Sequence, residues 1–456
     1  MSIPFRAASL AAVAYALAGA MLFADLPALG AQTMPDYHAR ADALITALAA
    51  GRYEQAAQDF SDAMRAALPP AKLAEAWRSV QAQAGAFQHT GTHADAQQGP
   101  YHTVIVEGVF ANATLDVKVT FDASEHVAGL FFSPHAAPAS SFAPPPYADS
   151  SRFHERDVSV GSGALALPAT LSMPVGPGPF PAVVLVHGSG PNDRDETVDA
   201  NKPFRDLAWG LASRGVAVLR YEKRTRAHPQ WFLARMSTFT VNDETVDDAI
   251  SAVALLRSTE GISANHVYVL GHSLGGTMIP RIGARDRAIA GFIIMAGATR
   301  PLEDLLVDQT SYLAGLSGDT SAAMKAHLDS VRAQAARVKS PTLSPSTPAS
   351  ELPLRMSAAY WLNLRGYDPA AEARKLDRPI LVLQGERDYQ VTLADFTGWR
   401  HALDRQRDVT FHLYPGLDHL FLMGTGKSTP AEYRQPGHVA EVVVRDIATW
   451  ITAQAR

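Results

Sequence analysis

From residue 153 to the end of the chain, short apolar runs alternate with segments of helical periodicity. The runs have no polar face, which is typical of strands covered on both sides, and the segments between them are long enough to return the chain for parallel pairing. This pattern predicts a doubly wound, mostly parallel sheet with helices on both faces. We expect two opening strands, at 155–160 and 164–173, and core strands at 182–186, 216–221, 267–270, 291–295, 380–383 and 409–413. Helices are expected near 203–213, 242–257, 275–285 and 438–452.

The interval 301–377 interrupts this alternation. It is too long for a simple crossover between strands, and it contains helical periodicity at 302–313 and 321–338. We therefore predict an inserted helical cap over the functional site.

A different pattern precedes residue 133. Residues 36–84 are rich in alanine with helical spacing, and strand-like runs follow at 103–110, 114–121 and 127–132. Helices followed by an antiparallel meander predict a small α+β domain over 34–132. The segment 133–152 is rich in proline, alanine and serine without an apolar period, which predicts an extended linker to a catalytic domain at 153–456.

The first 31 residues resemble a signal peptide. Arg6 precedes an apolar run from Ala7 to Phe23, and small residues follow at 28–31. We expect an exported protein, periplasmic or secreted, with no membrane association after cleavage. An uncleaved anchor is the alternative, because the apolar run approaches the shortest length that spans a bilayer.

Composition excludes several classes of function. The chain has no cysteine, so it has no disulfide, no thiol nucleophile and no cysteine-ligated zinc. A net charge of -5 offers no basic face for nucleic acid. The histidines lack the spacing of a metal site, so we expect no metal.

One serine follows a buried strand directly. The strand 267–270 enters the segment Gly271-His272-Ser273-Leu274-Gly275, and a helix follows. A serine at such a sharp strand-to-helix turn is held up as a nucleophile, and the small neighbours avoid collisions at the turn. Ser273 is therefore the predicted catalytic nucleophile.

A serine hydroxyl needs a base, and the base needs an orienting acid. After such a serine turn the acid and then the histidine usually follow along the chain. Asp388 lies just beyond the strand 380–383, and His419 lies on the loop after the strand 409–413. We assign them as acid and base. Two other carboxylates, Asp418 and Glu386, compete less well for the acid role, and two other histidines, His187 and His272, are expected to shape the backbone.

Acyl transfer also requires donors for the developing oxyanion. We expect the backbone amides of Leu274 and Ser189, the latter in the loop His187-Gly188-Ser189-Gly190. The charged segments 192–196 and 220–224 flank this loop, and we interpret them as a salt-bridged network bracing it, with binding of a charged substrate as the alternative. Aromatic candidates for the walls of the pocket, or equally for the core of the cap, are Trp231, Phe232, Tyr360, Trp361 and Tyr367.

These segments resemble the bacterial secreted esterases of the α/β-hydrolase superfamily, close to the dienelactone hydrolase and prolyl oligopeptidase branches. The resemblance is carried by HGSGPNDRDE at 187–196, RYEKRT at 220–225, GHSLGG at 271–276, YWLNLRGYDP at 360–369, LVLQGERDYQV at 381–391 and LDHLF at 417–421. Residues 36–132 also resemble a small domain of undefined role that precedes such hydrolases. The resemblance implies hydrolysis of short-chain carboxylic esters without a cofactor.

Other readings of the sequence remain open. The same triad serves peptidases and thioesterases, and a non-catalytic binding protein can use the same fold. The segment 424–429 imitates a phosphate-binding loop, but Phe421 stands where that motif requires glycine, so no nucleotide is expected. The expected partner is a small ester substrate, and a homodimer is one of the oligomeric states left open.

Overall fold

The computed structural model describes residues 36–98, 100–111, 113–134 and 142–455. They form two compact units that divide between residues 139 and 140. The predicted signal peptide, 1–31, lies outside the described residues. Within the described ranges, every helix is too short or too polar to cross a membrane.

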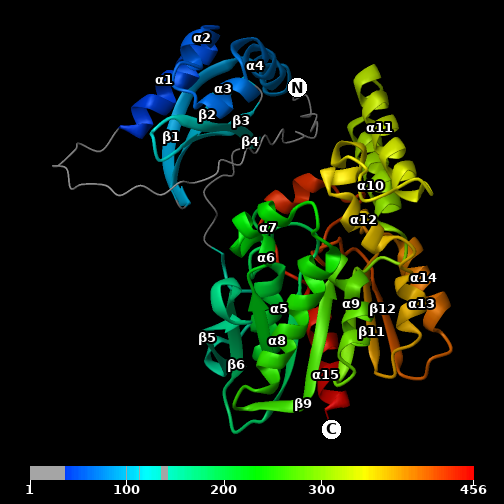
Figure 1. Cartoon of the computed structure of the whole chain (residues 1–456). Coiled ribbons are helices and arrows are strands. Elements are labelled where there is room, and N and C mark those ends of the chain that lie inside the picture. Colours follow the sequence, from blue (N-terminus) through cyan, green and yellow to red (C-terminus); the bar gives the residue numbers. More distant parts are fainter. Residues whose placement is uncertain (1–35, 99, 112, 135–141, 456) are drawn as a thin grey trace. The chain divides into compact units, whose positions relative to one another are not determined.

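The first unit combines helices with one antiparallel sheet (Figure 1). Its helices are α1 (Tyr37–Ala49), α2 (Tyr53–Ala56), α3 (Asp62–Ala67) and α4 (Pro70–Ala84). Its strands are β1 (Phe87–Gln98), β2 (Tyr101–Phe110), β3 (Thr114–Phe121) and β4 (Val127–Pro134), paired in that order. Alternate residues of β2 and β3 are buried, and they share a core with Trp77 of α4.

The strand β1 was not among the sequence predictions. Its sequence, FQHTGTHADAQQ, is mostly polar, and its residues are largely exposed or half-buried. Pairing with β2, through a ladder with two register shifts, holds it in the sheet. Backbone hydrogen bonds to a well-buried neighbour therefore define this strand, and its own apolar pattern does not.

The second unit contains an eight-stranded sheet in the order β12-β11-β10-β9-β7-β8-β6-β5. Its strands are β5 (Phe153–Val160), β6 (Leu167–Pro174), β7 (Phe180–Val186), β8 (Ala217–Tyr221), β9 (Ile262–His272), β10 (Gly291–Met295), β11 (Ile380–Gly385) and β12 (Val409–Tyr414). All pairings among β7 to β12 are parallel, and only β6, near one edge, runs the other way, pairing antiparallel with both β8 and β5. The predicted fold class, a doubly wound and mostly parallel sheet after a small α+β domain, is confirmed.

Both faces of this sheet are covered by helices. Along β7, Val184 belongs to the same core cluster as residues of α8 (Asp247–Arg257) and α9 (Leu274–Arg285). The next residue, Leu185, belongs to a second cluster with residues of α5 (Pro203–Ala212) and α15 (Glu441–Gln454). Successive side chains of a strand point to opposite faces, which is why the apolar runs are continuous.

The remaining helices lie mainly between β10 and β11, in the region predicted to be a cap. They are α10 (Leu302–Ser317), α11 (Ala322–Lys339), the 3₁₀ turns 349–351 and 353–355, α12 (Ala358–Leu364) and α13 (Pro369–Ala373). Figure 1 shows α10, α11 and α12 at the same end of the sheet as α6 (Arg224–Ala227) and α7 (Pro229–Arg235), two helices that the sequence did not predict. Within this region, α13 packs on α9 and on α14 (Leu393–Leu403) of the sheet layer.

Two residues of the segment predicted to be a linker, 133–152, form the end of β4, and the segment is described again from residue 142 onward. There it packs on the second unit, because the hydroxyl of Tyr147 donates to the carbonyl of Val439 at 2.7 Å and Phe142 makes an edge contact with Trp209. A 3₁₀ turn at Ser150–Arg152 then leads into β5.

Candidate active site

Ser273 lies between the last residue of β9 and the first residue of α9. Its backbone has φ 52° and ψ −116°, a conformation that non-glycine residues rarely adopt. Its amide donates to the carbonyl of Met295 at 3.0 Å, which fixes the turn against β10. The structure thus places Ser273 in the strained turn that the sequence predicted.

The glycines around Ser273 permit a very close approach of backbone segments. A Cβ on Gly271 would lie 2.3 Å from the carbonyl of Gly275, and a Cβ on Gly275 would lie 2.2 Å from the carbonyl oxygen of Val186. Real Cβ atoms do not make such contacts, so any side chain would push β9, α9 and the end of β7 apart. The glycine spacing is therefore a packing requirement of the turn.

The predicted base and acid contact each other. His419 Nδ1 lies 2.7 Å from Asp388 Oδ2, and both side chains are buried. The other oxygen of Asp388 accepts from the amides of Gln390 and Val391, which fixes the carboxylate in place. Because Nδ1 carries the proton toward Asp388, Nε2 of His419 is left to accept one.

The competing carboxylates occupy other environments. Asp418 accepts from the amides of Leu420 and Leu422, so it shapes the turn that carries His419. Burial raises the pKa of Asp418 to about 6. Glu386 is exposed. Of these carboxylates, only Asp388 makes a hydrogen bond to the imidazole of His419.

The loop after β7 lies against Ser273. A Cβ on Gly188 would be 3.1 Å from the Cβ of Ser273. The amide of Gly188 donates to Glu196 Oε1 at 2.5 Å, and the amide of Gly190 donates to Glu244 Oε1 at 3.2 Å. Among the described residues, no acceptor is found for the amide of Ser189 between them, nor for that of Leu274 at the start of α9. These two amides are the predicted oxyanion donors.

His272 and Glu196 form a buried pair beside Ser273. Nδ1 of His272 lies 2.9 Å from Glu196 Oε2, and its Nε2 donates to the carbonyl of His419 at 2.9 Å. Burial alone would lower the pKa of His272, but the adjacent charge of Glu196 raises the pKa overall. The pair connects the loop of Gly188 to the loop of His419. By contrast, burial lowers the pKa of His187 to about 4, so this ring is neutral.

The charged segments flanking the loop pair with one another. Lys223 Nζ contacts Glu244 Oε1 at 2.7 Å and the carbonyl of Gly188 at 2.5 Å, and Arg220 binds both Asp195 and Glu155. These contacts match the interpretation of a salt-bridged network that braces the loop.

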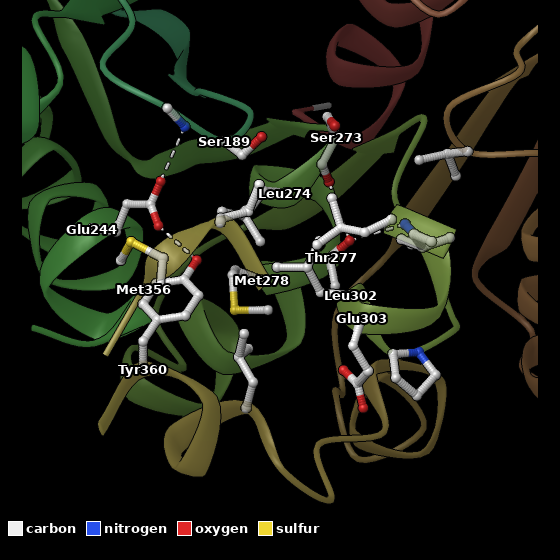
Figure 2. A pocket seen from close by; sticks show the side chains of 18 of the residues that line it. Ser189, Glu244, Ser273, Leu274, Thr277, Met278, Leu302, Glu303, Met356 and Tyr360 are labelled. Carbon is white, nitrogen blue, oxygen red and sulfur yellow. Dashed lines mark hydrogen bonds between the residues drawn. The ribbon is translucent and has the colours of Figure 1, made fainter. Parts of the chain in front are cut away.

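A cavity of about 380 Å³ opens from Ser273 (Figure 2). Its walls are mostly apolar and come from α9, α10, α12 and the loops beside them. Representative lining residues are Leu274, Met278, Leu302, Leu305, Leu306, Met356, Leu364 and Val391. Ser189 also lines the cavity. An apolar cavity with a nucleophile at one point is suited to a small substrate with a hydrocarbon portion.

The predicted aromatic wall residues divide into two groups. Phe232, Tyr360 and Tyr367 line the cavity. Trp361 does not, because it is fully buried in the core next to Tyr360. Trp231 does not line the cavity either, and its ring lies under the guanidinium groups of Arg224 and Arg235.

Sequence reasoning missed two carboxylates of the cavity wall, Glu244 and Glu303. Figure 2 shows Glu244 joined to Tyr360, whose hydroxyl donates to Oε2 at 2.7 Å. Both glutamates lie in helical segments of ordinary composition, so no local pattern marks them. The one sequence feature that could have pointed to Glu303 is its position between the leucines at 302 and 305 of α10. Across the described ranges, no group of three or more histidine and carboxylate side chains could hold a metal ion.

A serine at a strained strand-to-helix turn, a mostly parallel sheet and an imidazole–carboxylate pair beside it define a serine hydrolase of the α/β-hydrolase fold. The family model described as "Serine aminopeptidase, S33" matches residues 179–425, and the chain belongs to this family. Residues 41–130 match a family described as a protein of unknown function.

A curated relative and several solved structures are similar to this chain. Esterase EstD of Thermotoga maritima is 36% identical over 425 residues, covering 93% of this chain and 97% of that protein. Est1E from Butyrivibrio proteoclasticus is 14% identical with a TM-score of 0.42, covering 66% of this chain and 98% of that one. A 2,6-dihydroxy-pseudo-oxynicotine hydrolase is 19% identical with a TM-score of 0.40, covering 65% and 66%. The predicted esterase class agrees with the near full-length similarity to Esterase EstD.

Proposed function

We propose that this chain hydrolyses short-chain carboxylic esters through Ser273, His419 and Asp388. The similarity to Esterase EstD supports the ester bond as the target. The cavity of about 380 Å³ beside Ser273 supports a small acid or alcohol portion. No metal or organic cofactor takes part in the proposed reaction.

The proposed reaction has two halves. In the first, Ser273 Oγ attacks the ester carbonyl while His419 Nε2 takes its proton, and the amides of Leu274 and Ser189 bind the oxyanion. The C–O bond to the alcohol then breaks, and His419 returns the proton to the leaving oxygen. In the second half, His419 Nε2 takes a proton from a water molecule whose oxygen attacks the acyl carbonyl. The bond to Ser273 Oγ then breaks, His419 gives the proton to that oxygen, and the acid is released. Asp388 holds the imidazole in the required tautomer throughout.

The observation that carries this proposal is the 2.7 Å contact of His419 with Asp388 beside the serine turn. The test is hydrolysis of chromogenic esters of increasing acyl length. Ser273→Ala should fold normally and lose on the order of 10⁶-fold in kcat. Ser189→Ala is the matched control, because it removes a serine hydroxyl from the same cavity but keeps the backbone donor. Activity retained in Ser273→Ala would end the assignment.

Amide hydrolysis is the second candidate, because the matching family is described as a serine aminopeptidase. The same enzyme preparation should be given aminoacyl amides and thioesters beside the esters. A kcat/KM for an amide above that for the matched ester would replace the proposal with a peptidase, and a preference for thioesters would indicate a thioesterase. No turnover of any substrate would favour a binding protein on this fold.

We also propose that the protein is exported, from the signal-like segment at 1–31. N-terminal sequencing of protein from the periplasmic and culture fractions tests this, because cleavage near residue 31 is expected. Whether the protein forms a homodimer is tested by measuring the molar mass of the purified protein by light scattering.

A further inference from the structure

Glu303 is a buried carboxylate in the wall of the cavity that holds Ser273. It lies in the first turn of α10, and only 8% of the residue is exposed. In Figure 2, Ser273 and Glu303 lie at opposite ends of the labelled wall, with Thr277 and Leu302 between them. Glu303 is therefore removed from the reacting atoms, at the far end of the space that a substrate would occupy.

The other charged groups of this wall are neutralised by partners. Glu244 contacts Lys223 at 2.7 Å. Arg300 contacts Asp395 at 2.8 Å and also binds Asp308. The charge of the cavity wall is thus balanced except at Glu303.

Glu303 has no such partner among the residues that the structure describes. The carboxylate accepts a hydrogen bond from its own backbone amide. The nearby cations are engaged elsewhere, because Lys339 binds Asp304 and Arg365 donates to the carbonyls of Val338 and Ser340. Burial raises the pKa of Glu303, as expected for a carboxylate in an apolar wall.

A structural role in the helix does not require this placement. A carboxylate in the first turn stabilises a helix by its interaction with the helix dipole. Asp304 in the same turn has this position and is more exposed. A carboxylate directed into an apolar cavity costs stability unless a ligand supplies the missing charge.

We propose that Glu303 binds a cationic group at the far end of the substrate, an inference that rests on the proposed function. The substrate class is then a carboxylic ester in which a short aliphatic spacer separates the ester bond from an ammonium group. The spacer would lie along Leu274, Met278 and Leu302, and the cation would meet Glu303. Glu303 is a specificity residue in this proposal and takes no part in the chemical step.

The test uses two pairs of esters that differ only in charge. The acyl pair is phenyl 5-(trimethylammonio)pentanoate and phenyl 6,6-dimethylheptanoate, in which a tert-butyl group replaces trimethylammonium. The alcohol pair is choline butyrate and 3,3-dimethylbutyl butyrate. The full-length protein should prefer the cationic member of at least one pair by about tenfold or more in kcat/KM, equivalent to about 1.4 kcal/mol.

Glu303→Gln should reduce this preference to about one, through a rise in the KM of the cationic ester. Asp304→Asn is the matched control, because it removes the same charge from the same turn outside the cavity wall, and it should keep the preference. Calorimetry on Ser273→Ala protein gives a readout without turnover: pentyltrimethylammonium should bind, and the double variant with Glu303→Gln should bind at least tenfold more weakly.

A wild-type protein without preference in either pair, or a preference that survives in Glu303→Gln, would overturn the inference. Hydrolysis of the neutral esters without preference would leave the proposed esterase intact. Failure to hydrolyse any ester would instead count against the proposed function, and the calorimetric result would still decide whether Glu303 binds a cation.

Discussion

Glu196 should be essential for both stability and turnover, although it does not touch the substrate. One oxygen accepts from the amide of Gly188 and the other lies 2.9 Å from His272, which in turn donates to the carbonyl of His419. The side chain is 4% exposed. Glu196→Ala would leave the buried amide of Gly188 and the buried Nδ1 of His272 without a partner. Removing one member of a buried pair costs about 3–5 kcal/mol, so we expect a loss of this size in the free energy of unfolding.

Glu196→Gln should be milder, because an amide oxygen can still accept from Gly188. We expect a loss of about 1–3 kcal/mol. Turnover of an ester should fall by up to about 100-fold, since shifting the oxyanion loop by about 1 Å is enough for that. Urea unfolding and steady-state kinetics measure the two effects. Glu222→Gln is the control, because Glu222 pairs with Arg194 and Arg226 nearer the surface. This substitution should lower the free energy of unfolding by less than about 1 kcal/mol. Unchanged stability and turnover in Glu196→Ala would refute the bridging role.

Three further predictions follow from the same geometry. Asp388→Asn should lower kcat by about 10⁴-fold with little change in KM, measured by steady-state kinetics, because the imidazole loses its orienting acceptor. The pKa of His272 is raised and that of Glu196 is lowered, so their pairing stabilises the fold fully only between the ordinary values of 4.5 and 6.5. The difference in unfolding free energy between wild type and Glu196→Gln should therefore shrink as pH rises through the folded pKa of His272; a constant difference up to pH 9 would contradict this pairing. Gly275→Ala should prevent normal folding, seen in the yield of soluble protein and in thermal melts, whereas Gly315→Ala in α10 meets nothing within 4 Å and should stabilise by about 0.5–1 kcal/mol.

The strands of the second unit were predictable because each is buried on both faces. A run such as 291–295 is apolar throughout, and the structure has β10 over the same residues. The serine turn was predictable for a related reason. Gly271 and Gly275 are required by close backbone contacts, and those contacts also fix the spacing of the motif.

The features that the sequence did not reveal depend on contacts between distant segments. The strand β1 is polar and is held by pairing with β2. Glu244 lines the cavity, where Lys223 and Tyr360 bind it from other elements. Patterns of local periodicity carry no information about such partners, so the predicted wall contained aromatic residues and omitted both glutamates.

The residues of the proposed triad and those of the cavity wall lie on different parts of the fold. The proposed nucleophile, base and acid follow β9, β12 and β11, whose parallel pairing through β10 sets their relative positions. Much of the cavity wall, including Glu303, lies instead on α10 and α12, between β10 and β11. We therefore expect a substitution in this cap to change what fits beside Ser273 without moving the strands that carry the proposed triad. Replacing Glu303 should therefore change the choice between charged and neutral esters, whereas replacing Glu196 should slow the hydrolysis of both alike.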